Sequence, residues 1–227
     1  MREAHYSILL RAGPEISVCS TKAFSCQLSV LSLLALYFAR LGPMNKAEGQ
    51  KFLKEIIQIP NLIEMVLEQK EAIAALAKKY AYKSNFFFIG RQYMVPTCYE
   101  AALKLTEISY LSAFAYPAGE LKHGPIALID SNSVVIGLCG NAATYEKVLS
   151  NLTEVKARGA QIVAFAPQNS PEIEEIADDV LRLPPINDLL SPLPYTVASQ
   201  LLAYYIAKEL GTEIDQPRNL AKSVTVE

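Results

Sequence analysis

The chain has 227 residues, enough for one large domain or two modest ones around a buried core. Hydrophobic residues make up 51% of it and the net charge is −2, so it lacks the basic field of a nucleic-acid-binding protein. The most apolar stretch, residues 28–39, is interrupted by Ser32 and is shorter than a membrane span, and the N-terminus has no signal- or transit-peptide pattern. We therefore expect a cytoplasmic protein that does not cross a membrane, with 28–39 in a buried helix.

The cysteines argue against a metal site and against disulfides. No CxxC spacing occurs, and only two histidines are available as further ligands, so structural zinc is not expected. All the cysteines lie among apolar or small residues, which favours reduced and mostly buried thiols. They are Cys19, Cys26, Cys98 and Cys139.

The first 80 residues read as one strand followed by helices. Residues 7–13 are compatible with a strand, and the apolar spacing then predicts helices over 20–41, 46–59 and, after Pro60, 61–80. One strand followed by helices does not complete an α/β domain. We therefore interpret 1–80 as the last part of one domain together with linking helices.

The next segment, 81–214, reads as a complete α/β domain. Its apolar runs predict strands buried on both faces of a parallel sheet, and intervening helices imply right-handed βαβ crossovers and a doubly wound fold. Functional sites in such folds lie beyond the carboxyl ends of the strands. The predicted strands are 86–90, 134–140, 161–166 and the shorter 179–184; the predicted helices are 97–111 and 142–159, the second ending at Gly159.

Glu100, Lys104 and Glu107 lie at i, i+4 and i+7 of the first of these helices and therefore share one face. Spacing alone favours a solvated stripe with a weak Glu–Lys pair. The functional alternative is a general base whose pKa is tuned by the neighbouring lysine.

Residues 113–130 form a second segment with catalytic residue types. His123 lies between a lysine and a Gly-Pro turn, after a strand–helix unit where loops often carry function, and a short helix is expected to begin at Pro125. A histidine of this kind is as often structural or exposed as it is catalytic.

Residues 15–24 form a third segment. Ser17, Ser20 and Thr21 precede a long helix, so Ser20 or Thr21 is a natural N-cap. Alternatively, the hydroxyl and N–H groups there contact the oxygens of a ligand. No GxGxxG, Walker or GxSxG motif is present, so neither nucleotide binding nor an α/β-hydrolase is supported.

The last residues, 215–227, contain Lys222 behind a Pro-Arg-Asn turn. Composition alone would make this segment a frayed end.

Taken together in this order, "EISVCSTKAF", "EAALKLTEISY", "AGELKHGPIALID" and "DQPRNLAKSVTVE" resemble the isomerase part of the glutamine–fructose-6-phosphate aminotransferase (isomerizing) family. The resemblance covers about residue 6 to Glu227. It implies a sugar isomerase (SIS) fold, a doubly wound parallel sheet flanked by helices, preceded by the helical end of an incomplete first SIS domain. The domains would be 1–80, then a second SIS domain at 81–214, then an active-site tail at 215–227.

The resemblance also implies an activity. Members of this family convert fructose 6-phosphate and glutamine to glucosamine 6-phosphate and glutamate, the first step of amino-sugar synthesis, without a metal or an organic cofactor. Lys222 matches the lysine that forms a Schiff base with the open sugar, which requires a neutral amine. Glu107 matches the base that moves a proton between the first two sugar carbons. His123 matches the histidine that opens the sugar ring from the neighbouring subunit, and Lys104 is expected to be a charge partner of Glu107.

The same resemblance assigns binding roles. Val18 and Ser20 fall in the segment whose backbone and hydroxyl contact the sugar, and Arg218 and Asn219 are expected to fix the tail. The expected partners are fructose 6-phosphate, glucosamine 6-phosphate and a second copy in a homodimer that shares its site.

The family's glutaminase domain and the phosphate-binding loop of its first SIS domain have no counterpart in the sequence. We therefore expect no glutamine hydrolysis, and weak or no activity from these residues alone, since a phosphate dianion needs its cradle.

Two other functions fit an SIS fold: a non-catalytic phosphosugar-binding module, and a simple aldose–ketose phosphosugar isomerase. The presence of both Glu107 and Lys222 distinguishes the aminotransferase part from these two alternatives. A sensor needs no Schiff-base lysine, and a simple isomerase needs the base but no imine that awaits ammonia.

Overall fold

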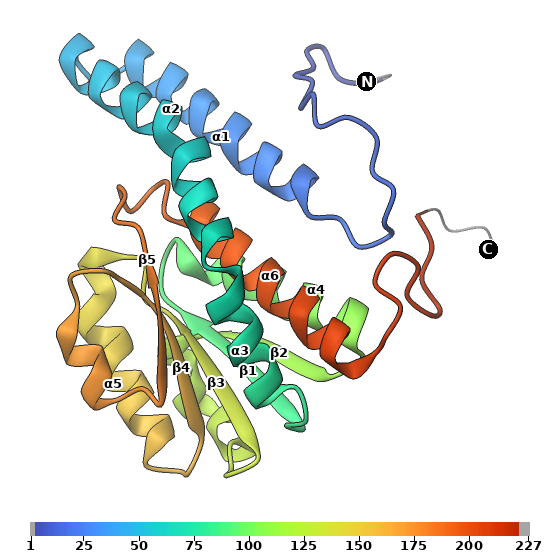
Figure 1. The fold of residues 1–227 in the computed structure, drawn as a ribbon. Helices are drawn as coiled ribbons and strands as arrows, with labels where there is room; N and C mark the ends of the chain where they lie inside the picture. The colour runs from blue at the N-terminus through green and yellow to red at the C-terminus, as the bar shows by residue number, and fades with distance from the viewer. Residues whose placement is uncertain (1–2, 223–227) are drawn as a thin grey trace.

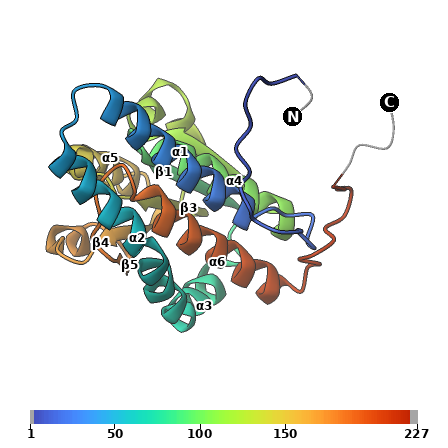
Figure 2. The same cartoon turned by 90° about the horizontal axis from the view of Figure 1, so that it is seen from above.

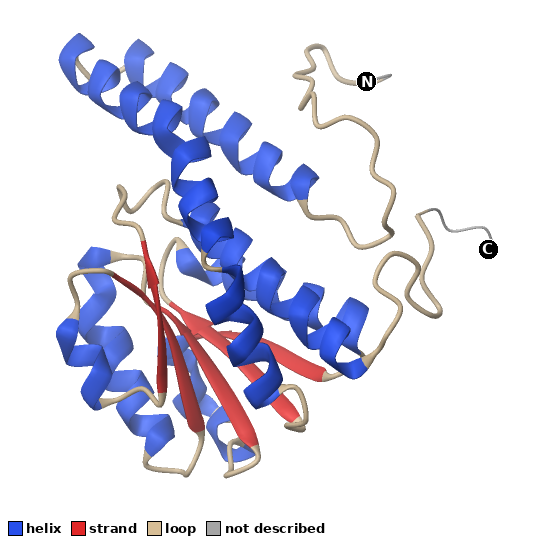
Figure 3. Ribbon diagram, viewed as in Figure 1, coloured by secondary structure: helices blue, strands red, loops and turns tan. Residues whose placement is uncertain are grey.

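The computed structural model describes residues 3–222, in which a five-stranded parallel sheet carries helices on both faces (Figures 1 and 3). The strand order is β2-β1-β3-β4-β5. The strands are β1 (Asn85–Gly90), β2 (Ser112–Pro117), β3 (Ser133–Leu138), β4 (Gln161–Pro167) and β5 (Asp179–Leu183). The α-helices are α1 (Lys22–Leu41), α2 (Lys46–Glu68), α3 (Lys70–Tyr80), α4 (Met94–Ser109), α5 (Tyr145–Lys156) and α6 (Pro192–Leu210). Short 3₁₀ helices are η1 (Ala118–His123), η2 (Pro125–Leu128), η3 (Ala142–Thr144) and η4 (Pro171–Glu175).

The central strands divide two hydrophobic layers between them. Alternate side chains of a strand point to opposite faces, so Phe86 and Phe88 of β1 pack in the layer under α3, α4 and α6. Phe87 and Ile89 point to the other layer, which is covered by α5. Because both faces are covered, β1 and β3 have almost no polar positions, as expected of a parallel sheet. The doubly wound α/β fold predicted from the sequence is confirmed.

Four predicted strands correspond to β1, β3, β4 and β5, and the predicted helices at 97–111 and 142–159 correspond to α4 and to η3 with α5. α5 ends at Lys156, and the turn that follows it contains Gly159, whose φ of +87° favours glycine. The short helix expected at Pro125 forms as η2, with the proline in its first turn.

Two elements of the structure, β2 and α6, are not predicted by the sequence patterns. β2 lies at the sheet edge, and its alternation of small and aromatic residues resembles a loop because only one of its sides is paired. α6 packs against α2, α3 and α4 and is apolar around most of its circumference. A helix buried on several sides shows no amphipathic period, so its sequence carries no helical stripe.

Three predictions for the N-terminal region are wrong. Residues 7–13 form no strand, because Arg11 and Gly13 have positive φ angles and the segment lies outside the sheet. The predicted break at Pro60 does not occur. Instead α2 runs through Pro60 and ends at Glu68, since its flanks at Ile59 and Ile63 pack against Leu190 and Leu193, which offsets one lost hydrogen bond.

The third error concerns residues 28–39, which were expected in a buried helix. They form most of α1, and α1 has no buried residue. It packs against α2 and more loosely against α6, and the three helices lie side by side when seen from above (Figure 2). Large apolar side chains of α1 stay exposed, among them Leu31, Tyr37 and Phe38. By length and composition alone, α1 is the one helix among residues 3–222 that could cross a membrane.

Candidate active site

The charged face of α4 is mostly buried, so the interpretation of Glu100 and Lys104 as a solvated stripe is wrong. Lys104 is 4% exposed and Glu100 is 8% exposed. Lys104 Nζ donates to Glu107 Oε2 at 2.6 Å, and Gln200 Nε2 of α6 donates to Glu100 Oε1 at 3.1 Å. The sheet-facing side of α4 carries Ala101 and Leu105, and the charged side faces α6 and the segment before α1.

The charge states in this layer follow from burial and from the lysine. Burial raises the pKa of Glu100, and the nearby Lys104 and Gln200 offset this only in part. Burial lowers the pKa of Lys104, but its hydrogen bond to Glu107 and the charges of Glu100 and Glu107 outweigh burial and raise it. Lys104 is therefore a buried ammonium that donates a charge-assisted hydrogen bond to Glu107 beside it.

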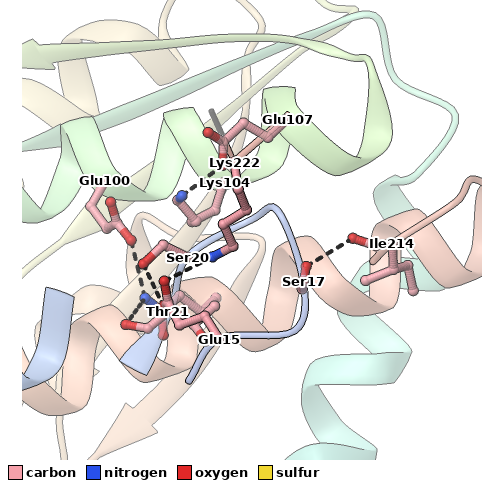
Figure 4. Close-up of polar contacts among 10 residues, drawn as sticks. Glu15, Ser17, Ser20, Thr21, Glu100, Lys104, Glu107, Ile214 and Lys222 are labelled. Atoms are coloured by element: carbon pink, nitrogen blue, oxygen red, sulfur yellow. Dashed lines mark hydrogen bonds and ion pairs between the residues drawn. The ribbon is translucent and has the colours of Figure 1, made fainter. Parts of the chain in front are cut away.

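Residues 15–21 lie across this face as an ordered segment before α1 (Figure 4). Ser20 Oγ donates to Glu15 Oε1 at 2.7 Å. Thr21 occupies the N-cap position of α1, as predicted, but its side chain makes no capping hydrogen bond. The Cys19 thiol is buried, and burial raises its pKa to about 12, so it is a protonated packing group rather than a nucleophile.

The start of the tail is hydrogen-bonded to the same segment. Val18 N–H donates to the carbonyl oxygen of Asp215 at 2.9 Å. Ser17 Oγ donates to the carbonyl oxygen of Ile214 at 3.4 Å. A cavity of about 200 Å³ lies where the segment, α4, α6 and the tail meet, and Lys104 lines it.

Further along the tail, Arg218 is held by Tyr110, the residue that ends α4. Its N–H donates to the tyrosine hydroxyl at 3.0 Å, and its guanidinium lies 4.2 Å from the ring centroid. Asn219 adopts a left-handed conformation with φ +62°, which turns the chain after Arg218.

Lys222 then reaches back to the segment before α1. Its Nζ lies 2.8 Å from Glu15 Oε2, and Figure 4 shows the side chain pointing toward Glu15. The last five residues of the predicted tail, 223–227, lie outside the described residues.

Of the residues proposed from the sequence, the structure thus gathers seven in one region: Lys104 and Glu107 on α4, Val18 and Ser20 before α1, and Arg218, Asn219 and Lys222 on the tail. The sequence did not single out Glu15 or Tyr110, although both lie inside the quoted motifs. Glu15 contacts Lys222 and Tyr110 contacts Arg218, each about a hundred residues or more away along the chain, and no local pattern marks such contacts.

His123 is the exception, because it lies at the opposite ends of the strands, beyond the carboxyl end of β2. α4 runs back along the sheet, so Glu107 lies near the amino end of β2, and His123 follows its carboxyl end in η1. A strand of six residues separates these ends by roughly 20 Å. The His123 side chain is 62% exposed, with Nε2 3.9 Å from the Glu120 carboxylate. Within one chain, the histidine does not meet the cluster on α4.

Among residues 3–222, no group of three or more histidine, cysteine or acidic side chains has the arrangement of a metal site.

The model of the SIS domain family matches residues 79–209. Glutamine–fructose-6-phosphate aminotransferases (isomerizing) from Thermus thermophilus and Methanosarcina mazei are each 49% identical over all 227 residues. The chain spans 38% and 37% of the length of these two relatives.

Among solved structures, the chain is similar to the C-terminal domain of glucosamine–fructose-6-phosphate aminotransferase from Francisella tularensis. That comparison has a TM-score of 0.89 and 38% identity, and covers 95% of this chain and 62% of the other. A glucosamine-6-phosphate deaminase from Thermotoga maritima has a TM-score of 0.69 at 24% identity, which shows a shared fold.

Proposed function

The chain belongs to the SIS domain family, and we propose that it is the isomerase part of a glutamine–fructose-6-phosphate aminotransferase. In this proposal it converts fructose 6-phosphate and ammonia to glucosamine 6-phosphate, with the ammonia supplied from glutamine in the complete enzyme. The observation that carries the proposal is the docking of Lys222 on the segment before α1, next to the helix that presents the Lys104–Glu107 pair. The relatives that match along the whole chain bear the name of this enzyme.

The first chemical step falls to Lys222. Its neutral amine adds to the C2 ketone of open-chain fructose 6-phosphate, forming a C–N bond while the carbonyl oxygen takes up a proton. Loss of that oxygen as water leaves an iminium at C2. Ammonia then adds to the same carbon and displaces the lysine amine, so nitrogen stays on C2 and Lys222 is regenerated.

The second step falls to Glu107. Its carboxylate removes a proton from C1, and the electrons move to form an enolamine between C1 and C2. The resulting carboxylic acid returns the proton to C2, and the C1 hydroxyl releases its own proton to solvent, which leaves an aldehyde at C1 and an amine at C2. Lys104 supports this role because its hydrogen bond to Oε2 holds the Glu107 carboxylate in place before the step.

We assign ring opening to His123 of a second copy, because in its own chain His123 lies beyond the opposite end of β2. This assignment implies a homodimer with a shared site. Val18 and Ser20 would contact the sugar. Arg218 and Asn219 would fix the approach of Lys222, since Arg218 contacts Tyr110 and the chain turns at Asn219. A cytoplasmic location fits a metabolic enzyme of this kind.

The test is to trap the imine. The complete gene product that contains this chain is incubated with fructose 6-phosphate and sodium borohydride, and the adduct is located by peptide mass spectrometry. We expect one sugar adduct on Lys222, absent from the Lys222→Met variant and retained in the Lys147→Met variant, whose lysine is exposed on α5. An adduct on another lysine, or none in the wild-type protein, would overturn the Schiff-base role.

A further inference from the structure

Glu15 is the side chain of the segment before α1 that makes the most polar contacts. Oε1 accepts a hydrogen bond from Ser20 Oγ at 2.7 Å, and Oε2 lies 2.8 Å from Lys222 Nζ. The side chain of Glu15 is 23% exposed, and the hydrogen bond from Ser20 orients its carboxylate. None of the reaction steps above uses it.

The contacts of the tail divide into two groups. Those of Ile214, Asp215 and Arg218 fix its beginning and its middle and leave Lys222 at the end of a short span. Among residues 3–222, the contact with Glu15 is the one hydrogen bond or ion pair that holds the amine itself. The position of the amine therefore depends on Glu15 more than on the rest of the tail.

We propose that Glu15 is a positioning residue that docks the Lys222 amine at the site between reaction cycles, a role that rests on the function proposed above. Ser20 orients the carboxylate and the carboxylate orients the amine, so a relay of two hydrogen bonds leads from the start of α1 to the reactive nitrogen. Before the amine adds to the ketone, Lys222 must leave this contact and release its ammonium proton to solvent, to which its side chain is 40% exposed.

The charge on Glu15 favours positioning over proton transfer. The hydrogen bond from Lys222, followed by that from Ser20, lowers the pKa of Glu15. A carboxylate with a lowered pKa is a weaker base than an ordinary one and is a poor acceptor for the ammonium proton. The neighbouring charged groups on α4, Glu100, Lys104 and Glu107, are engaged with one another or with Gln200.

Lysine footprinting tests the docking directly and requires no catalysis. The complete gene product is treated with a limiting amount of acetic anhydride, and the acetylation rate of Lys222 is measured by peptide mass spectrometry relative to Lys147. An ion pair this exposed changes a docked population only modestly, so Glu15→Gln is expected to raise the relative rate about two- to fivefold. Glu15→Asp should recover part of the protection, and Glu146→Gln, an exposed substitution on α5, should leave the rate unchanged.

A second readout links docking to chemistry. At saturating fructose 6-phosphate, borohydride trapping in Glu15→Gln should slow by the same two- to fivefold factor and recover in Glu15→Asp. Equal acetylation of Lys222 in wild type and Glu15→Gln would overturn the positioning role, as would faster acetylation with unchanged trapping. If the wild-type protein traps no adduct while Glu15 still protects Lys222, the Schiff-base proposal fails and the docking contact stands.

Discussion

The sheet and the candidate active site are assembled from different parts of the chain. β1, β3 and β4 are buried almost throughout and pair in parallel with strands that follow them closely along the chain. The site joins Glu15 to Lys222, two residues 207 positions apart, through polar contacts near the surface (Figure 4). The sheet is thus held by apolar burial within one continuous segment, whereas the site depends on the docking of the two ends of the described chain.

The difference is also seen between the carboxyl and the amino ends of the strands. At the carboxyl ends of the strands, the Asp188 carboxylate accepts hydrogen bonds from the N–H groups of Ala142 and Ala143. The backbone donors of the loop after β3 therefore have hydrogen-bond partners within the chain. Near the amino end of β2, by contrast, Glu107 and Lys222 keep part of their side chains open to solvent. We therefore expect the sheet to form without the site, but not the site without the sheet.

The largest effect is expected from the core. Phe88→Ala removes a ring that is 1% exposed and should lower the free energy of unfolding by about 3–5 kcal/mol, measured by urea denaturation. Phe114→Ala, at the edge strand and 37% exposed, is the matched control and should cost about 1 kcal/mol. Similar losses at both positions would show that the sheet is not the stable unit of the molecule.

The next effect tests the buried ion pair that joins the sheet layer to the site. Glu107→Gln leaves the Lys104 ammonium, 4% exposed, facing a neutral amide, and should lower the free energy of unfolding by about 1–3 kcal/mol. It should also reduce the isomerisation rate by about 10²–10⁴-fold, since the base is lost. Unchanged stability in urea would mean that Lys104 finds another partner, and unchanged turnover would remove Glu107 from the mechanism.

The pH dependence of stability gives a smaller effect with a defined sign. Burial raises the pKa of Glu100 above the ordinary value of 4.5, so ionising it costs more in the folded than in the unfolded state. Its contribution to stability is therefore lost as pH rises from about 4.5 through the raised pKa. Glu100→Gln should gain stability relative to wild type between pH 4 and pH 7 in urea denaturation. A relative loss over that range would show that Lys104 outweighs burial at this position.

The smallest effect on stability is expected at Lys222. Its ion pair with Glu15 is partly exposed, so Lys222→Met should change the free energy of unfolding by about 0.5 kcal/mol or less while abolishing sugar trapping. A large loss of stability in thermal denaturation would contradict the view that the tail docks on a preformed domain.

Sequence patterns predicted the sheet better than its surroundings. β1, β3 and β4 are found because strands buried on both faces read as continuous apolar runs. β2 and α6 are missed because an edge strand and a helix buried on several sides lack the periods of two and 3.6 residues on which prediction depends. α1 is found as a helix, but its exposure is not predicted, since hydrophobicity does not say which elements pack together.

By itself, the sequence determined which strands form the centre of the sheet and which residue types are available for chemistry, because apolar runs and quoted motifs are local properties of the chain. The tertiary structure decided the rest. It buried Lys104 beside Glu107, placed His123 beyond the carboxyl end of β2 and brought Glu15 to Lys222. Such contacts depend on how the helices and the two ends of the chain pack on a completed sheet, and no spacing along the chain encodes that packing.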